Sequence, residues 1–441
     1  MQGAAAGLRH TVRPTLHRKL AACATAALLP LWACGGSITA TGQSDGGTGG
    51  SAYTQSGGSA TLSGKAYTAT ASDASGVYVT NAGTLSLSAS TVATTGSTTS
   101  PDSSSFYGLD AGVLANAGST IVLTGSSVST TGTGANGVFA SGSGTSVTLV
   151  NDTIACTGQL GHGVDATLGA TMTLTDVRIT TGPGANSAAI ATDRGGGTVT
   201  ATGGSFTTSG ADAPGIYSTG DITVNGAAVA ASGSEAAVIE GANSITLTNT
   251  SLAGTLKWGV MIYQSMSGDA QGTRGTFTMT GGSLSAAAGP LFYVTNSTGV
   301  ITLSGVSLSA PSGVLVSAAA GNWGTAGSNG GTAILTADGQ TLAGSLVSDG
   351  YSTITATLKN GSTLSGAVNA AALTLDASST WSVTANSRLT SLTDAGGLSG
   401  TTLTNIVGNG HAVTYDATRA ANAWLGGQTY SLTNGGTLAP Q

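Results

Sequence analysis

The sequence predicts an all-β chain wound as a right-handed parallel β-helix, and two regular spacings lead to this prediction. In residues 146–166, SVTLVNDTIACTGQLGHGVDA, Leu149 closes an apolar-Thr-apolar triplet, Ile154 follows it by five residues and Val164 follows by ten more. The five-residue step recurs in every copy over residues 60–316, and the ten-residue step recurs in most. Alternating apolar residues are typical of short strands, and a period of about 23–27 residues is typical of stacked repeats.

Four-residue corners separate the predicted strands, such as TGSS at 124–127, VNDT at 150–153 and TGGS at 280–283. Gly and Asn supply the left-handed or Asx geometry of a tight turn. Each copy then has three short strands and three corners. A single copy cannot bury its apolar face, so each strand is expected to pair with the copies before and after it.

This stacking predicts columns of equivalent side chains. Two inward columns are expected, the first with Leu123, Leu149, Leu174, Val224, Leu247, Met279 and Leu303, the second with Val128, Ile154, Ile179, Phe206, Val229, Leu252 and Leu284. An outward column of threonines is expected at Thr148, Thr173, Thr200, Thr223, Thr246, Thr278 and Thr302. Threonine suits a solvated sheet face because it is β-branched and polar.

The composition agrees with a β-rich chain that covers itself with hydroxyl groups. Among 441 residues only 7% are charged, 40% are hydrophobic, 71 are glycine, and the net charge is −6. Disordered chains instead combine high charge with low hydrophobicity. Basic residues are few and unclustered, so we expect no nucleic-acid partner.

The first 33 residues are predicted to be a lipoprotein-like signal peptide. Basic residues from Arg9 to Lys19 precede an apolar run that ends in LWAC, where Leu31 and Ala33 precede Cys34 as in a lipobox. Cys34 is therefore the expected lipidation site, with cleavage by an ordinary signal peptidase as the alternative. No other apolar span of membrane length follows.

Residues 34–58 are Gly/Ser-rich and are predicted to form a flexible tether, followed by the β-helix repeat region at 59–316. Cys156 is the one cysteine beyond Cys34, so no intrachain disulfide is expected after lipidation. It lies two residues after inward Ile154, and we interpret it as a packed thiol rather than a nucleophile.

After residue 316 the coils shorten, and residues 317–441 are predicted to form shorter β-helix coils and a C-terminal cap. The pattern L-x-x-x-S-x-W-x-V-x-x-x-S from Leu375 to Ser387, with Trp381 expected near the axis, resembles the C-terminal coils of autotransporter passenger domains. The repeat region resembles the wider pectin-lyase-like β-helix class in its pattern. No translocator barrel follows before Gln441, so a lipid on Cys34 is expected to take its place as the anchor.

One outward row is predicted to carry recognition. The position after the third-strand aliphatic residue is aromatic or acidic in most copies: Tyr78, Phe139, Asp165, Tyr217, Glu240 and Tyr263, with Ala191 and Thr295 as the other members. Exposed rings could stack on sugar rings, and carboxylates could accept hydrogen bonds from hydroxyl groups. The alternative is that the rings merely cover the sheet and support strand pairing.

Two long corners offer a second candidate surface. Residues 263–275, YQSMSGDAQGTRG, have Lys257, Trp258, Asp269 and Arg274 on or near them, and residues 317–331 carry Trp323. Insertions in repeat proteins map to loops and often to the binding side. Neutral drift at a tolerant corner is the alternative.

Catalysis is the less favoured reading. Enzymes of the pectin-lyase class use clustered Asp with a Lys or Arg base, and here Asp110 and Asp165 are expected two coils apart with no basic residue in the row. His162 is interpreted as a surface residue at a corner.

We therefore expect a non-enzymatic, adhesin-like protein on the cell surface. It would be tethered by lipid to the outer membrane of a Gram-negative cell, or else be secreted or periplasmic, and would bind a glycan, matrix or host protein without a cofactor. A polysaccharide lyase or glycoside hydrolase of the β-helix class is the alternative.

Overall fold

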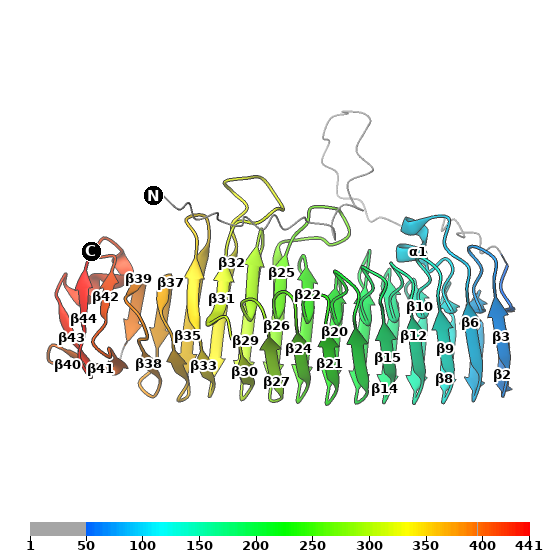
Figure 1. Cartoon of the computed structure of the whole chain (residues 1–441), viewed down its shortest axis with the longest axis horizontal. Helices are drawn as coiled ribbons and strands as arrows, with labels where there is room; N and C mark the ends of the chain where they lie inside the picture. Colours follow the sequence, from blue (N-terminus) through cyan, green and yellow to red (C-terminus); the bar gives the residue numbers. More distant parts are fainter. Residues whose placement is uncertain (1–49, 395) are drawn as a thin grey trace, which may run out of the picture. The chain divides into compact units, whose positions relative to one another are not determined.

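A computed structural model describes residues 50–394 and 396–441. The predicted signal peptide at 1–33, Cys34 and most of the predicted tether lie outside the described residues. Within the described part, strands wind into successive coils that stack along one axis, as Figure 1 shows.

Each coil of the repeat region contributes one strand to each of three faces. The first face holds β1 (Tyr53–Ser56), β4 (Val77–Thr80), β7 (Val113–Ala115), β10 (Val138–Ser141), β13 (Val164–Thr167), β16 (Ile190–Thr192), β19 (Ile216–Ser218), β22 (Ala237–Glu240), β25 (Val260–Tyr263), β28 (Phe292–Thr295) and β31 (Val314–Ala318). The second face holds β2 (Ser59–Ser63), β5 (Thr84–Ser88), β8 (Thr120–Thr124), β11 (Ser146–Val150), β14 (Thr171–Thr175), β17 (Thr198–Thr202), β20 (Asp221–Asn225), β23 (Ser244–Thr248), β26 (Arg274–Thr280) and β29 (Thr298–Ser304). The third face holds β3 (Ala66–Ala69), β6 (Thr91–Thr94), β9 (Ser127–Thr130), β12 (Thr153–Cys156), β15 (Arg178–Thr181), β18 (Ser205–Thr208), β21 (Ala228–Ala231), β24 (Ser251–Gly254), β27 (Ser283–Ala286) and β30 (Ser307–Ser309).

The pairing confirms the predicted right-handed parallel β-helix. Every strand of the three faces pairs in parallel with its equivalents in adjacent coils; β11, for example, lies between β8 and β14, with Leu149 beside both Leu123 and Leu174. The predicted columns are therefore adjacent rungs of one ladder. The backbone groups of each coil find their hydrogen-bond partners in the neighbouring coils, as buried backbone requires.

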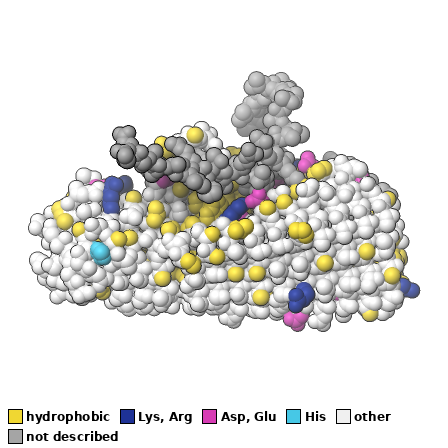
Figure 2. All heavy atoms as spheres, viewed as in Figure 1, with side chains coloured by type: hydrophobic (Ala, Val, Ile, Leu, Met, Phe, Trp, Pro, Cys, Tyr) yellow, Lys and Arg dark blue, Asp and Glu magenta, His cyan; other side chains and the backbone are white. Residues whose placement is uncertain are grey.

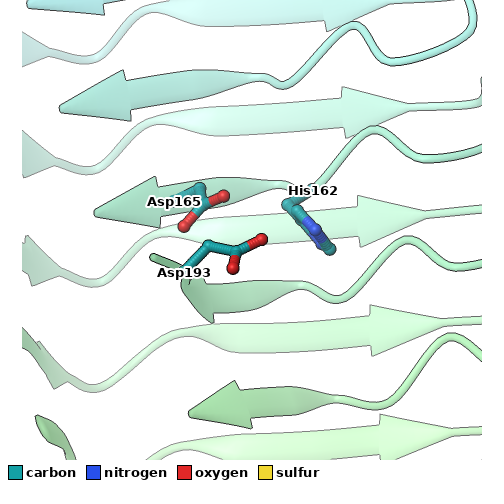
Figure 3. A group of neighbouring side chains, drawn as sticks. All are labelled: His162, Asp165 and Asp193. Atoms are coloured by element: carbon teal, nitrogen blue, oxygen red, sulfur yellow. The ribbon is translucent and has the colours of Figure 1, made fainter. Parts of the chain in front are cut away.

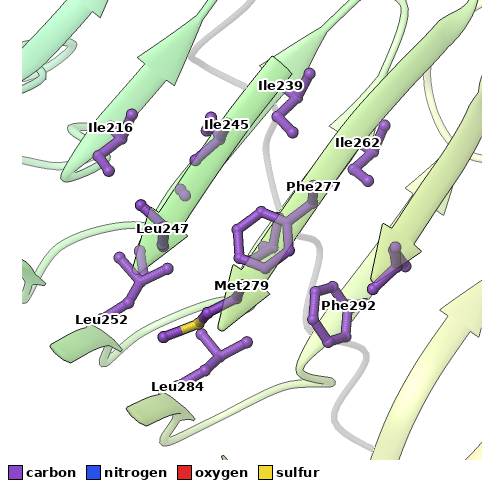
Figure 4. Close-up of a cluster of buried hydrophobic side chains, with 14 of the residues drawn as sticks. Ile216, Ile239, Ile245, Leu247, Leu252, Ile262, Phe277, Met279, Leu284 and Phe292 are labelled. Atoms are coloured by element: carbon purple, nitrogen blue, oxygen red, sulfur yellow. The ribbon is translucent and has the colours of Figure 1, made fainter. Parts of the chain in front are cut away.

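The core is a continuous stack of aliphatic and aromatic side chains inside the coils. The predicted inward residues from Leu123 to Leu303 are buried, and Figure 4 shows part of the stack around Leu247, Phe277 and Met279. Phe277 and Phe292 meet edge to face with ring centroids 5.5 Å apart. The threonines between the inward pairs face out, and Thr173, Thr200 and Thr223 are exposed.

Cys156 belongs to this core, as predicted. Its side chain is fully buried, and its thiol donates a weak hydrogen bond to the carbonyl of His162 at 3.4 Å. Burial raises the pKa of this thiol to about 11, so the reactive thiolate is disfavoured.

Longer strands and shorter coils form the C-terminal part. They are β32 (Thr332–Asp338), β33 (Thr341–Ala343), β34 (Ser345–Ser348), β35 (Thr353–Lys359), β36 (Thr363–Ser365), β37 (Val368–Leu375), β38 (Thr380–Ser382), β39 (Ser387–Asp394), β40 (Leu398–Ser399), β41 (Thr402–Val407), β42 (Ala412–Tyr415), the 3-10 helix η2 (Ala420–Leu425), β43 (Tyr430–Thr433) and β44 (Thr437–Pro440). Trp381 is buried as expected, and its Nε1 donates to the carbonyl of Gly366 at 2.9 Å. Two antiparallel pairs, β40–β41 and β43–β44, lie in the last coils.

Two details differ from the sequence-based expectation. The predicted tether extends to residue 58, but Tyr53–Ser56 form β1, which pairs with β4. The corner after β6 contains a helix, α1 (Pro101–Tyr107). Ser100 caps it by accepting from the amide of Ser103, proline occupies its first turn, and Gly108 ends it in the left-handed region at φ 74°. The segment Ser-Pro-Asp was a sequence signal for this helix start.

Candidate functional site

The predicted recognition row is on the outside of the first face, but it is not exposed. Phe139, Asp165, Glu240 and Tyr263 are at most 1% exposed, and Tyr78 and Tyr217 are partly buried. The expectation of a solvent-facing stripe is therefore wrong. The alternation of sides was correct, since these residues form clusters separate from the core, but other segments cover them.

The covering segments are the long corners of the coils. Phe139 packs against Leu114 and Ala111 beside α1, and the hydroxyl of Thr167 donates to the carbonyl of Phe106 in α1 at 2.9 Å. Ser265, in the corner after β25, contacts Glu240, and Trp323, in the corner after β31, packs on Tyr263 with ring centroids 5.0 Å apart. The corners thus form a second layer over the first face.

The strand register also corrects the row itself. Asp165 lies beside Phe139 and Ala191, and this row continues through Tyr217 to Val238, Met261 and Tyr293. Glu240 and Tyr263 pair with each other two residues further along their strands, together with Thr295. A shift of two residues leaves a side chain on the same face, so the repeat pattern could not reveal it.

Asp110 does not belong to this row, because Leu114 occupies its position in β7. Asp110 lies in the corner after α1 and is fully buried. Burial, and then the nearby Asp73, raise its pKa to about 7. The expectation that Asp110 lies in this row, two coils from Asp165, is therefore wrong in register.

Glu240 is the centre of a buried hydrogen-bond network. Its Oε2 accepts from the hydroxyl of Tyr217 at 2.7 Å and from that of Tyr263 at 2.5 Å. Its Oε1 accepts from the amide of Ser265 at 3.3 Å and from the same residue's hydroxyl. Burial raises the pKa of both tyrosines, with the Glu240 carboxylate as the next cause. The network fixes the corner after β25 onto the face.

Arg194 joins two of the covering segments. Its Nη2 donates to Oδ1 of Asp269, in the corner after β25, at 3.1 Å. Its guanidinium carbon lies 3.8 Å from the ring centroid of Phe106 in α1, a cation–π contact. The sequence did not indicate a role for Arg194, because Asp269 is 75 residues further along the chain and Phe106 belongs to a much earlier corner.

His162, Asp165 and Asp193 come together beneath these segments, and Figure 3 shows their side chains facing one another. One ligand atom from each lies within 4.8 Å of the other two. Burial raises the pKa of Asp165, and the Asp193 carboxylate adds to this effect. Burial likewise raises the pKa of Asp193, followed by Asp269 and Glu240. His162 was expected to be a surface residue, but it is partly buried within this group.

An aromatic surface lies further along the same face. Trp258 and Tyr293 stack with ring centroids 4.1 Å apart and planes at 26°, and Trp323 belongs to the same cluster. All three side chains are partly exposed, and Leu256 beside them is 61% exposed. In the view of Figure 2, hydrophobic side chains gather near the middle of the molecule, next to basic and acidic groups. We call Trp258, Tyr293 and Trp323 the aromatic surface.

The charged residues expected around the long corner are not all together. Lys257 pairs with Asp212 and, at 3.4 Å, with Glu235, whereas Asp269 pairs with Arg194. Arg274 is exposed at the start of β26. Of the residues expected at the two long corners, Trp258 and Trp323 thus belong to the aromatic surface, and Lys257 is next to Trp258 in sequence.

Comparisons with known proteins leave the fold as the basis for classification. No protein-family model matches the chain, and a search of curated proteins also finds no match. Among the described residues, no helix is long and apolar enough to cross a membrane. The coils and their register define the chain as a parallel β-helix protein.

Proposed function

We propose that this chain is an adhesin-like surface protein that binds a glycan through the aromatic surface formed by Trp258, Tyr293 and Trp323. The observation that carries the proposal is the stacked Trp258–Tyr293 pair, which remains partly exposed, with Tyr293 on β28 and Trp258 in the corner just before β25. Aromatic faces suit the C–H faces of sugar rings, and they dominate binding energy at many interfaces. Trp258 and Trp323 lie in corners but pack against the strand residues Tyr293 and Tyr263, and rings held in place in this way lose less entropy on binding.

The surroundings supply polar partners for the sugar hydroxyl groups. Lys257 lies next to Trp258 in sequence and holds Asp212 and Glu235 in ion pairs. Charged groups beside an aromatic platform give orientation and specificity, as in many ligand sites. The proposal moves the contact surface away from Phe139, Asp165, Glu240 and Tyr263, because a ligand cannot reach these buried residues in this conformation.

A glycan array with the purified full chain tests the proposal. Trp258→Ala and Tyr293→Ala should each weaken binding by about thirtyfold, which corresponds to roughly 2 kcal/mol for an aromatic hot spot. Tyr107→Ala is the matched control, since Tyr107 is an exposed aromatic residue of α1, remote in sequence from this surface. The proposal fails if no glycan binds, or if the control loses binding equally.

We also propose that a lipid on Cys34 anchors the chain to the outer membrane, with Leu31 and Ala33 as the supporting sequence. Incorporation of a fatty-acid probe by the full chain in cells should disappear in Cys34→Ser. Unchanged incorporation in the variant, or none in the wild type, would reject the anchor without affecting the glycan proposal.

The enzymatic alternative came from the resemblance to β-helix polysaccharide enzymes, which would need carboxylates such as Asp110 and Asp165 to face a polymer. Both side chains are fully buried, so neither residue supports this alternative in this conformation. Incubation of the purified chain with acidic and neutral polysaccharides checks it directly, with release of new reducing or unsaturated ends as the signal.

A further inference from the structure

The covered part of the first face holds more acidic than basic side chains. Four carboxylates lie there with at most 9% exposure: Asp165, Asp193, Glu240 and Asp269. Within the described part of the chain, Arg194 is the one Lys or Arg that forms an ion pair with any of them, through Asp269. Buried charges are ordinarily paired or bound to metal, because an unpaired one loses several kcal/mol of solvation.

Asp165 is the least compensated of the four. Its side chain is 0% exposed, and neither of its carboxylate oxygens accepts a hydrogen bond from any residue that the structure describes. It points toward Asp193 and His162, as Figure 3 shows. The Oδ1 of Asp193 accepts a hydrogen bond from the backbone amide of Arg194 at 2.8 Å, and this bond orients the carboxylate.

The imidazole of His162 has a structural role that limits what it can bind. Its Nδ1 accepts the amide proton of Ala188, in the next coil, at 2.9 Å. One coil earlier, Asn136 does the same for the amide of His162, with its Oδ1 at 2.7 Å. His162 therefore continues a ladder that Asn136 begins.

This ladder leaves no free lone pair on the ring. The lone pair of Nδ1 is directed at the amide of Ala188, so the proton of the neutral ring is on Nε2. In this geometry the imidazole borders the group without being a metal ligand. The oxygens of the two aspartates are then the available protein ligands.

We propose that Asp165 and Asp193 bind one divalent cation that prefers oxygen ligands, such as Ca²⁺ or Mn²⁺. Carboxylates and water are the ligands these ions favour, whereas Zn²⁺ favours imidazole and thiolate. The ion links the outer side of β13 to the segment that follows β16, and it supplies the positive charge that this part of the face lacks. The proposal does not depend on glycan binding, since the two sites share no residue.

The test uses the purified full chain, dialysed against EDTA and then against buffer at pH 7.5. Isothermal titration with Ca²⁺, Mn²⁺, Mg²⁺ and Zn²⁺, each alone, should show one Ca²⁺ or Mn²⁺ per chain, and the bound ion should raise the thermal unfolding midpoint by several degrees. Asp165→Asn keeps the size of the side chain and removes its charge, so it should abolish both effects. Asp193→Asn should do the same, and far-UV dichroism checks that each variant is folded.

Two variants serve as controls. In His162→Asn the new side-chain oxygen can accept the amide of Ala188, just as Asn136 accepts the amide of His162. This variant should therefore keep the cation response. Asp110→Asn removes another fully buried carboxylate with no hydrogen-bond partner among the described side chains, and should also leave it unchanged.

Three outcomes would overturn the proposal. The first is the absence of any bound ion in the wild type. The second is an unchanged response in folded Asp165→Asn or Asp193→Asn. The third is binding of Zn²⁺ alone that His162→Asn removes, which would make the imidazole a ligand. If one aspartate variant does not fold, the wild-type titration and the other aspartate variant decide.

Discussion

The hydroxyl of Tyr263 donates to Oε2 of Glu240 at 2.5 Å, across the paired strands β25 and β22. Tyr217 donates to the same oxygen, so two buried phenols satisfy one buried carboxylate. Removing one of these hydroxyl groups would leave the buried carboxylate of Glu240 with fewer hydrogen bonds and no water to replace them. This relationship makes Tyr263 part of the structure that holds the corner after β25, rather than a free contact residue.

Tyr263→Phe should therefore lower the free energy of unfolding by about 1–3 kcal/mol, the usual cost of leaving a buried hydrogen-bonding group without its partner. Tyr78→Phe is the matched control, because Tyr78 is partly exposed and bonds with the neutral side chain of Asn116 at 3.1 Å. It should cost less. Urea unfolding followed by tyrosine and tryptophan fluorescence measures both, and an equal cost would contradict the role given to Glu240.

The sequence was sufficient for the coil and its core, and the reason is physical. A strand has a side-chain period of two, and a core selects apolar residues at every inward position, so Leu149 and Ile154 show the same spacing as their equivalents. The side of Tyr217 and Tyr263 followed from the same alternation. Trp381 was placed correctly by the resemblance pattern around it, and its buried Nε1 finds an acceptor in the carbonyl of Gly366.

What the repeat could not reveal is the second layer. The long corners have no period, so nothing in their sequence shows that Ser265 reaches Glu240 or that Phe106 reaches Arg194. Burial of Asp165 depends on these contacts between corners that are far apart in the chain. The sequence also did not show that His162, Asp165 and Asp193 come together, because Asp193 lies in the corner after β16, outside the strand positions that define the repeat.

Asp110 should make stability depend on pH. Its folded-state pKa of about 7 is above the value of about 3.9 expected when unfolded, so the neutral form favours folding. This contribution is fully present below about pH 4 and is lost as the pH rises through 7. Asp110→Asn keeps the left-handed backbone at φ 67°, which asparagine tolerates.

The unfolding midpoint of Asp110→Asn, compared with that of the wild type, should therefore rise progressively between pH 4 and 8. Thermal melts in matched buffers at each pH measure the difference. A difference that stays constant over this range would show that Asp110 keeps its ordinary pKa in the folded chain.

A column of glycines at one corner allows the coils to approach closely. The added Cβ at each position would overlap a carbonyl oxygen of the preceding coil, at Gly132, Gly158, Gly184, Gly210 and Gly233. At Gly158 this oxygen is that of Gly132, only 1.9 Å from the Cβ position. Thr-Gly or Ser-Gly pairs after strands of the third face, as at Gly132, Gly158, Gly210 and Gly233, were a sequence signal for this column.

Gly158→Ala should cost about 1–3 kcal/mol or more, because backbone must move to admit the methyl group. Gly350→Ala is the control, since a Cβ there has no neighbour within 4 Å and no left-handed φ to strain. It should change stability by less than about 0.5 kcal/mol. Similar melting of the two variants would mean that the coils can separate at this corner without cost.

Arg194 allows the second layer to be tested separately from the coils. Its guanidinium contacts the Phe106 ring in α1 and the Asp269 carboxylate in the corner after β25, so one side chain holds two covering segments. Arg194→Lys keeps the positive charge but removes the planar guanidinium, which makes both contacts at the same time. Amide hydrogen exchange, read by mass spectrometry of peptides, should then become faster in residues 101–107 and 264–273.

The inward strands should keep their protection, because their hydrogen bonds run between coils and do not involve the covering segments. Arg178→Lys is the control, since Arg178 is exposed on the third face. Faster exchange in 264–273 alone would show that the contact with Phe106 holds nothing. Unchanged exchange in both segments would show that the Glu240 network and the apolar contacts of Phe139 suffice to keep the face covered.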